Sequence, residues 1–259
     1  MGPSTASMVE YLPKPLVSKI GRRDRYPIWI AKSILRQDLL GIDFLHQSGI
    51  SHGDLQPGNL LFSVAALYLW TRFVYRNKKS ILLSLQPIER QDRKVDLWAP
   101  KYLAVNQLLT EFVDLNPNFV IKISDMGGVP TRSQDIWSFC CLVFEFIIGR
   151  PLFVVDTTGN KDETNDDHFL QLFSLLDTSP QSYIGELPEG FDLNDLQPLL
   201  PLEVLFDQEK PVDMRDEDSK QIKHILRWIL QQDDTKRPSA SQLLSDPWFL
   251  ELSTKKSQA

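Results

Sequence analysis

The stretch His52-Gly53-Asp54-Leu55-Gln56-Pro57-Gly58-Asn59 decides how the fold of this chain is interpreted. It places a carboxylate, Asp54, and a carboxamide, Asn59, five positions apart in a segment that Gly and Pro bend into a loop. A second stretch, Ser124-Asp125-Met126-Gly127-Gly128, puts another carboxylate before a flexible pair of glycines. Carboxylate and amide oxygens suit a hard cation such as Mg²⁺. The two stretches together predict a polar site that holds a metal ion and orients a nucleophile.

The chain around these stretches predicts the elements that would position them. Apolar residues recur at helical spacing from Ile28 to His46, which predicts a buried helix leading into the first loop. Leu60 to Val64 predicts a short strand after that loop, and Val120 to Ile123 predicts a strand that leads into the second stretch. Between the strands, about residues 65–118 show no clean periodicity, so we expect an insertion there.

The second half of the chain has a mostly helical pattern. Residues 178–218 are polar and rich in proline and predict an irregular connection, whereas residues 251–259 predict a tail. Residues 1–27 carry four prolines and predict a hinge-like segment and linker, so the compact domain would span residues 28–250. We therefore expect a mainly α fold with a few short strands, within the α+β family. The expected helices are Gln134–Ile148, His168–Leu176, one marked by Ile222 to Leu230, and a short one capped by Ser239 that ends before Pro247.

The composition limits the classes of function. The 259 residues are 42% hydrophobic and 24% charged, which is enough for one substantial core. The formal net charge of −6 disfavours a broad basic surface for direct nucleic-acid binding. The adjacent thiols of Cys140 and Cys141 are typical of a reduced compartment, so we expect an intracellular protein, cytoplasmic or nuclear. The N-terminus lacks a signal-peptide pattern, and the apolar run Ile136 to Ile148 is too short for a bilayer, so no membrane partner is expected.

At these residues the chain resembles a protein kinase. His52 to Asn59 is similar to the catalytic loop of that family, and Asp125-Met126-Gly127 is similar to its metal-binding D-F-G motif. Asp135-Ile136-Trp137-Ser138 resembles the start of the central helix of the kinase large lobe, and Arg237-Pro238 resembles a motif near its end. The motifs follow the family's order. The resemblance implies a protein-kinase-like large C-terminal lobe, with a long insertion before D-M-G, that uses ATP and Mg²⁺.

The resemblance also implies a role for each side chain, although each has a plainer explanation as a turn, cap or core residue. Asp54 would be the catalytic base, with Gln56 in the place of the usual phosphate-contacting lysine. Asn59 and Asp125 would bind Mg²⁺, and Leu61 would form the floor of the adenine pocket. Four residues would be structural: His52 packing beneath the metal-binding motif, Met126 replacing the usual Phe, Asp135 hydrogen-bonding the catalytic-loop backbone, and Arg237.

Within the kinases, the catalytic loop, D-M-G-G and the long insertion are most similar to the serine/arginine-rich protein kinase group, in its fungal type. That resemblance implies a basic, Arg/Ser-rich protein substrate that is phosphorylated on serine. An acidic segment fits docking of such a peptide, and a solvated charged loop explains the same residues equally well. Its acidic residues are Asp156, Asp162, Glu163, Asp166 and Asp167.

Three departures from the kinase pattern predict impaired turnover. No G-x-G-x-x-G stretch and no A-x-K precede the catalytic loop, and Met1 to Glu10 resembles the end of the interlobe hinge, so we expect the chain to be truncated and the small N-terminal lobe to be absent. Only Val129 to Ser133 separate the second stretch from the next helix, which is about 17 Å when fully extended. Gly53 and Gln56 replace the usual Arg and Lys, and Arg237 lacks the glutamate that it would pair with.

Three functions remain open from the sequence. The first is an ATP-dependent serine/threonine protein kinase with impaired turnover. The second is a catalytically dead, pseudokinase-like binding module, or a fragmentary gene model of a kinase. The third is a small-molecule phosphotransferase of the aminoglycoside or choline kinase type, in which H-G-D-L-x-P-x-N also occurs. The stretch from Asp135 and the Arg237-Pro238 pair favour a protein kinase over the third.

Overall fold

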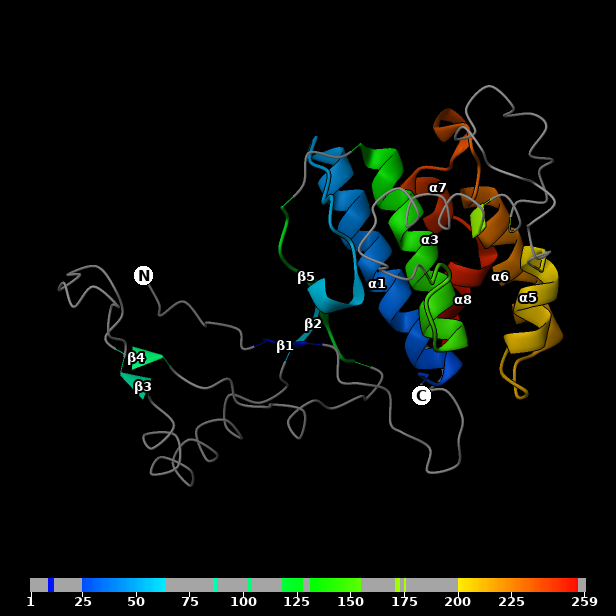
Figure 1. Cartoon of the computed structure of the whole chain (residues 1–259), viewed down its shortest axis with the longest axis horizontal. Helices are drawn as coiled ribbons and strands as arrows, with labels where there is room; N and C mark the ends of the chain where they lie inside the picture. Colours follow the sequence, from blue (N-terminus) through cyan, green and yellow to red (C-terminus); the bar gives the residue numbers. More distant parts are fainter. Residues whose placement is uncertain are drawn as a thin grey trace, which may run out of the picture. The chain divides into compact units, whose positions relative to one another are not determined.

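The structure is a computed structural model that describes residues 9–11, 25–63, 86–87, 102–103, 118–127, 131–154, 171–172, 175 and 200–255. The chain divides into two compact units (Figure 1). One contains Met1–Pro13 and Leu61–Lys122, and the other contains Lys14–Leu60 and Ile123–Ala259. Each described helix belongs to the second unit. None of the helices in the described part of the chain has the length and apolar character that crossing a bilayer requires.

Short strands build the first unit. Three of them form a sheet with β2 in the middle, and two others form a separate antiparallel pair. In the first sheet β1 runs antiparallel to β2, with Glu10 opposite Phe62, and Phe62 is fully buried against the edge of the Phe119 ring. The predicted strands beside the two loops are confirmed, whereas β1 lies where a linker was expected and β3 and β4 lie in the predicted insertion. The strands are β1 (Val9–Tyr11), β2 (Leu60–Ser63), β3 (Gln86–Pro87), β4 (Tyr102–Leu103) and β5 (Ile121–Ile123).

Two long helices form the centre of the second unit. Helix α1 (Ile28–Gln47) and helix α3 (Arg132–Ile148) lie side by side in Figure 1, as the spacing of their apolar residues predicts. The side-chain oxygen of Thr131 accepts a hydrogen bond from the backbone N–H of Gln134 and caps the start of α3. Gly149 ends α3 with φ of 87°, a left-handed conformation that costs glycine little. Buried apolar side chains therefore hold together the two helices that flank the predicted site.

Smaller helices pack around this pair, and two of them correct the sequence prediction. Helix α5 (Leu202–Glu209) lies in the stretch expected to be irregular, where Leu202 and Phe206, four positions apart, are both buried. Helix α8 (Pro247–Lys255) begins at the proline that was expected to stop a helix, and it runs into the predicted tail. Proline fits the first turn of a helix because its missing N–H would have no partner there. The other two, α6 (Asp216–Ile229) and α7 (Ala240–Leu244), were predicted, and Ser239 caps α7 with a complete capping box.

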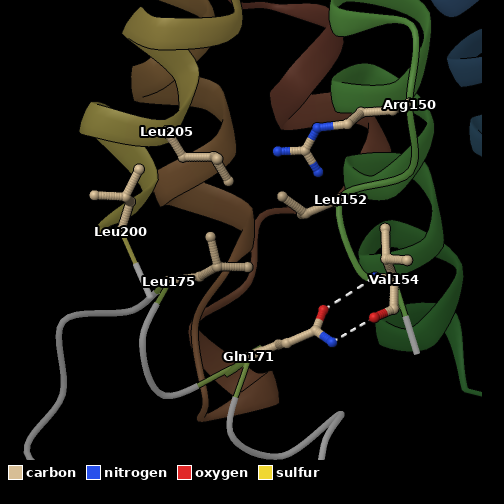
Figure 2. A pocket seen from close by; sticks show the side chains of 7 residues that line it. All are labelled: Arg150, Leu152, Val154, Gln171, Leu175, Leu200 and Leu205. Atoms are coloured by element: carbon tan, nitrogen blue, oxygen red, sulfur yellow. Dashed lines mark hydrogen bonds between the residues drawn. The ribbon is translucent and has the colours of Figure 1, made fainter. Parts of the chain in front are cut away.

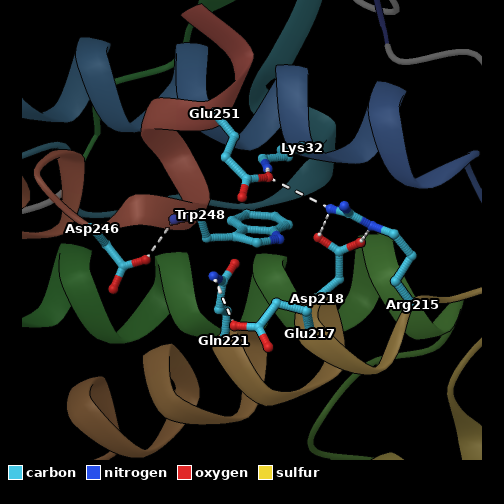
Figure 3. Close-up of polar contacts among 8 residues, drawn as sticks. All are labelled: Lys32, Arg215, Glu217, Asp218, Gln221, Asp246, Trp248 and Glu251. Atoms are coloured by element: carbon cyan, nitrogen blue, oxygen red, sulfur yellow. Dashed lines mark hydrogen bonds and ion pairs between the residues drawn. The ribbon is translucent and has the colours of Figure 1, made fainter. Parts of the chain in front are cut away.

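A buried lysine joins α1 to α6 and α8 (Figure 3). Lys32 is almost fully buried; its ammonium lies 3.3 Å from the Glu251 carboxylate and 4.9 Å from the centre of the Trp248 ring. Arg215 forms a bidentate ion pair with Asp218, at 2.6 and 2.8 Å, and also hydrogen-bonds to Glu251 at 3.5 Å. This network gives the C-terminal helix α8 polar contacts in addition to the burial of its aromatic residues.

The far end of α3 opens on an apolar cavity of about 340 Å³ (Figure 2). The side-chain amide of Gln171 donates to the backbone oxygen of Val154 and accepts from its N–H, so one glutamine satisfies both backbone groups. Residues 171–172 and 175 are helical, in agreement with the helix predicted over His168–Leu176. The cavity is lined by Arg150, Leu152, Val154, Gln171, Leu175, Leu200 and Leu205.

Candidate active site

The first polar loop is anchored to the start of α3 by one carboxylate. Asp135 accepts hydrogen bonds from the backbone N–H groups of His52 and Gly53, each at 2.8 Å, and its Oδ2 lies 2.8 Å from the Nε2 of His46. Burial raises the pKa of Asp135, but the hydrogen bonds from His46 and from the two backbone groups outweigh this effect and hold the pKa below its usual value. Asp135 thus makes the backbone contacts that the resemblance implies. The last turn of α1 and the first turn of α3 jointly position the loop.

The backbone of the loop explains one departure from the kinase pattern. Gly53, which stands where arginine is usual, has φ of 84°, in the left-handed region that a side chain disfavours. His52 beside it is fully buried, and its Nε2 lies 2.9 Å from the backbone oxygen of Ser124 while its Nδ1 accepts from the N–H of Asp54. His52 therefore links the two polar stretches, which agrees with a structural role.

Asp54 and Asn59 lie in direct contact. The Nδ2 of Asn59 donates to the backbone oxygen of Asp54 at 2.7 Å and to its carboxylate Oδ2 at 3.1 Å. Gln56 donates from Nε2 to the same Oδ2 at 2.9 Å. Both side-chain amides therefore hold Oδ2 of an exposed residue, and Oδ1 accepts no hydrogen bond from the described residues. Gln56 orients Asp54 in this structure, a contact that the sequence-based interpretation did not predict.

The second stretch joins the first through Ser124. Its backbone N–H and its hydroxyl both donate to the backbone oxygen of Asn59, at 2.9 and 3.1 Å. Asp125 follows with φ of 61°, the one positive φ of a non-glycine residue among the described residues. Such a backbone conformation is costly for most residues and least so for Asp and Asn. A strained polar residue beside two others supports a hypothesis of function.

A glycine in α1 lies close to the side chain of the residue that leads into this second stretch. A Cβ added to Gly41 would be 2.5 Å from the Cδ1 of Ile123, the residue two positions before Asp125. Alanine at this position would require the end of the Ile123 side chain to move, and glycine avoids this contact although it costs about 1 kcal/mol relative to alanine in the middle of a helix. Sequence reasoning missed Gly41, although an isolated glycine in a helical pattern is a signal of close packing.

The donor set fits a hard divalent cation. The Nδ2 of Asn59 faces Asp54, so its Oδ1 is the atom left for a metal ion, and Asp125 offers a carboxylate on the neighbouring segment. Two carboxylates and one amide resemble a Mg²⁺ site that completes its coordination with phosphate oxygens and water. No cluster of three or more His, Cys, Asp or Glu residues suited to a metal occurs in the described ranges.

The structure corrects or leaves open three other predicted roles. Met126 is 58% exposed, so it does not supply the packing expected for the residue after Asp125. Arg237 forms no ion pair with a carboxylate within the described part of the chain, and it instead hydrogen-bonds to Gln231 and Ser133 and lies over the Trp137 ring. Leu61 lies on β2 in the first unit and is half-buried, and its adenine-pocket role stays a prediction. The acidic residues Asp156, Asp162, Glu163, Asp166 and Asp167 lie outside the described residues.

A further carboxylate on α1 was missed entirely. Asp38 is fully buried, and neither of its carboxylate oxygens has a hydrogen-bond partner among the described residues. Burial, with a smaller contribution from the charge of Asp135, raises the pKa of Asp38 from 3.8 to about 8. Two carboxylates near the loop anchor therefore have opposite ionisation behaviour.

Comparison with known proteins gives a consistent result. Residues 117–249 match the protein kinase domain. The chain is 26% identical to a serine/threonine-protein kinase SRPK of Physarum polycephalum, over 87% of this chain and 62% of that protein. It is 24% identical to the protein kinase gsk3 of Schizosaccharomyces pombe, over 95% of this chain and 55% of that protein. It is 27% identical to cyclin-dependent kinase 11.2 of Caenorhabditis elegans, over 94% of this chain and 32% of that protein.

The chain matches only part of each of these relatives. The chain spans less than two thirds of each relative, from 32% to 62% of its length. The match to the kinase domain includes Asp125, Asp135 and Arg237, and it begins after the loop that contains Asp54. The alignments with the three relatives each cover at least 87% of the chain, so they include that loop as well.

Proposed function

Because the chain belongs to the protein kinase family, we propose that it acts as a Mg·ATP-dependent serine/threonine protein kinase. The observation that carries the proposal is the contact between Asp54 and Asn59 in a loop anchored by Asp135. The hydrogen bonds from Ser124 to Asn59 keep Asp125 on the adjoining segment. Such a group supplies a carboxylate for a hydroxyl nucleophile and oxygen ligands for the metal that accompanies the nucleotide.

Asp54 is suited to orient a serine hydroxyl. Its Oδ2 is held by Asn59 and Gln56, so the carboxylate is fixed while Oδ1 remains able to accept the hydroxyl proton. The side chain is exposed, which allows a protein substrate to reach it. Preorganisation of this kind lowers the cost of aligning the nucleophile, because the acceptor does not have to be positioned at each turnover.

Asn59 and Asp125 are the residues that would hold Mg²⁺. When bound, the ion would neutralise charge on the phosphates of ATP. Asn59 contributes a neutral oxygen from a side chain that is almost fully buried, and Asp125 contributes charge from an exposed side chain. The left-handed backbone of Asp125 is compatible with asparagine, so the charge can be removed without changing the conformational preference.

We also propose that turnover by this chain is low. Gln56 offers a phosphate no positive charge, and in the structure its amide already binds Asp54. Only Met126 to Thr131 lie between Asp125 and the first residue of α3, which leaves little chain for a peptide-binding platform. Loss of a single preorganised electrostatic contact typically costs about 10²–10³ in rate.

The substrate proposed is a basic, Arg/Ser-rich protein phosphorylated on serine. The formal net charge of −6 favours a cationic partner, and one relative is named as an SRPK. The proposed location is intracellular, cytoplasmic or nuclear. The thiols of Cys140 and Cys141 are both free, which agrees with a reducing compartment.

The test is a pair of binding and transfer assays on the full chain. We expect Mg·ATP to raise the melting temperature by a few degrees and ATP with EDTA to raise it less. Asp125→Asn should lose the magnesium-dependent part, and Asp54→Ala should keep it. Transfer of radiolabelled phosphate to an Arg/Ser peptide should stay near background, so Asp54→Ala should produce no detectable further loss.

The outcomes separate the competing functions. Absence of any magnesium-dependent stabilisation by ATP would overturn the proposed kinase and leave a binding module. Strong transfer that Asp54→Ala abolishes would support the kinase and contradict low turnover. Transfer to an aminoglycoside or to choline, and not to the peptide, would instead identify a small-molecule phosphotransferase.

A further inference from the structure

A second cavity, lined by polar residues, lies beside His46, at the junction of three segments of the second unit. Its volume is about 340 Å³, and it is bounded by the last turns of α1, the first turn of α3 and the connection into α7. Asp54, Asn59 and Asp125 are not among its lining residues. The charged or titratable side chains that line it are Asp43, His46, Arg132 and Arg237.

Arg237 is a preorganised cation in this cavity. Its Nε donates to the backbone oxygen of Gln231 at 2.9 Å, and its Nη1 donates to the hydroxyl of Ser133 at 3.2 Å. The guanidinium also lies over the Trp137 ring, 4.7 Å from its centre. Burial lowers the pKa of Arg237, with the charge of Asp234 acting in the opposite direction. In the described part of the chain, no ion pair of Arg237 with a carboxylate is found, so the cation is partly desolvated and held by neutral groups.

Arg132 supplies a second guanidinium to the same cavity, from an exposed position at the start of α3. The charge of Asp234 acts on Arg237 from outside the lining, and among the lining residues one negative charge opposes the two arginines. That charge, Asp43, accepts hydrogen bonds from Ser241 and from Gln47 at 2.8 Å, so its oxygens are already engaged. The hydroxyl of Ser239 adds a hydrogen-bond donor to the wall, whereas the hydroxyl of Ser133 already donates to the backbone oxygen of Asp234. Two cations and one hydroxyl donor around a cavity form a set that favours a compact anion with several acceptor oxygens.

We propose that this cavity binds a phosphate monoester, with Arg132 and Arg237 as its cationic ligands. A phosphate has more acceptor oxygens than a carboxylate and close to two negative charges at neutral pH, which matches two guanidiniums. The volume accommodates a phosphorylated side chain and not only the bare ion. The site is independent of the proposed kinase function, because none of the residues assigned to nucleotide or nucleophile takes part in it.

The position of the site gives binding a physical route to the catalytic loop. His46 lines the cavity, and its Nε2 also contacts the Oδ2 of Asp135, the atom that holds the His52 backbone. A ligand that orders the cavity wall would therefore act two side chains away from the loop.

Calorimetric titration of the full chain at constant ionic strength tests the proposal. The probes are inorganic phosphate, a phosphoserine peptide, and the same peptide with glutamate in place of phosphoserine. Arg132→Gln should weaken phosphate binding about tenfold, because it removes one charge-assisted contact from an exposed side chain. Asp43→Asn should strengthen binding, because it removes the opposing charge from the wall. Lys236→Gln is the matched control: it removes a nearby surface charge that does not line the cavity, and binding should not change.

The affinities of the three probes distinguish the possible ligands. Tighter binding of the phosphopeptide than of inorganic phosphate identifies a phosphorylated side chain as the ligand, and equal binding of the two identifies free phosphate. Equal binding of the glutamate peptide would overturn a phosphate site. An equal loss of affinity in Arg132→Gln and Lys236→Gln would also overturn it, because that result would indicate a diffuse surface effect. Melting temperatures of the three variants, which alter exposed or half-buried positions, verify that each is folded.

Discussion

Replacing Asp38 should stabilise the protein and remove a distinctive pH dependence. The side chain is fully buried on α1, and neither carboxylate oxygen has a hydrogen-bond partner in the described ranges. Burial raises the pKa of Asp38 from 3.8 to about 8, and the negative charge of Asp135 adds to this effect. The folded protein therefore binds a proton at Asp38 that the unfolded chain has released at neutral pH.

The sign and size of this pH effect on the free energy of unfolding follow from proton linkage. Because the pKa is higher in the folded state, the folded chain holds more protons between pH 3.8 and about 8, and the free energy of unfolding falls as the pH rises through that range. Each pH unit above the unfolded-state pKa of 3.8 lowers the free energy of unfolding by about 1.36 kcal/mol, so the destabilisation by Asp38 at pH 7 is on the order of 4 kcal/mol. Above about pH 8 the penalty stops growing. Asp38→Leu should recover about 2–4 kcal/mol at pH 7, because part of the gain is lost to repacking.

Urea unfolding followed by circular dichroism at several values between pH 5 and pH 8 measures the effect. Asp38→Asn should flatten the pH dependence but stabilise less than leucine, because the buried amide still lacks partners. Asp213→Asn is the control, since its carboxylate is 85% exposed and should leave the slope unchanged. A slope in Asp38→Asn equal to that of the unaltered chain would refute the reasoning.

Two further predictions concern buried charges whose partners are known. Glu251→Gln should lower the free energy of unfolding by about 1–3 kcal/mol because it removes the carboxylate that pairs with the buried Lys32 ammonium and leaves only the weaker influence of Asp218, whereas Lys32→Met should be nearly neutral in the same urea assay. Asp135→Asn should lower the free energy of unfolding by a similar amount at pH 7. Because the pKa of Asp135 is depressed, its stabilisation is present above pH 3.8 and is lost as the pH falls through the lower folded-state pKa. The free energies of unfolding of the unaltered chain and of Asp135→Asn should therefore converge in that acidic range.

Periodicity and end signals were enough to predict the elements around the site. The helix ending near His46, the strands on either side of the insertion and the apolar helix that begins near Asp135 all have patterns that few other structures would satisfy. Helix α8 was missed because Pro247 was interpreted as a stop signal, although proline also suits a first turn. Helix α5 was missed because its stretch was interpreted as irregular from its prolines and its polarity. The composition of a short helix does not distinguish these uses.

The sequence motifs selected the candidate site residues but did not predict their contacts. Asp54, Asn59 and Asp125 were selected by motif, and their neighbourhood agrees with that selection. The hydrogen bond from Gln56 to Asp54 and the close packing of Gly41 depend on local backbone geometry, which no residue pattern encodes. The exposure of Met126 likewise could not be read from the motif, which predicts packing for that position.

The pair formed by Asp38 and Asp135 shows why sequence polarity alone does not determine charge. Both are buried aspartates, and the charge of Asp135 raises the pKa of Asp38. Asp135 has three donors, His46 and the backbone N–H groups of His52 and Gly53, so it keeps the charge. Asp38 has none among the described residues, so it takes the proton. The number of donors within reach decides which carboxylate ionises, and the loop that contains Asp54 is anchored by the one that has them. Removing the charge of Asp135 should therefore also lower the pKa of Asp38, which makes the two substitutions non-additive.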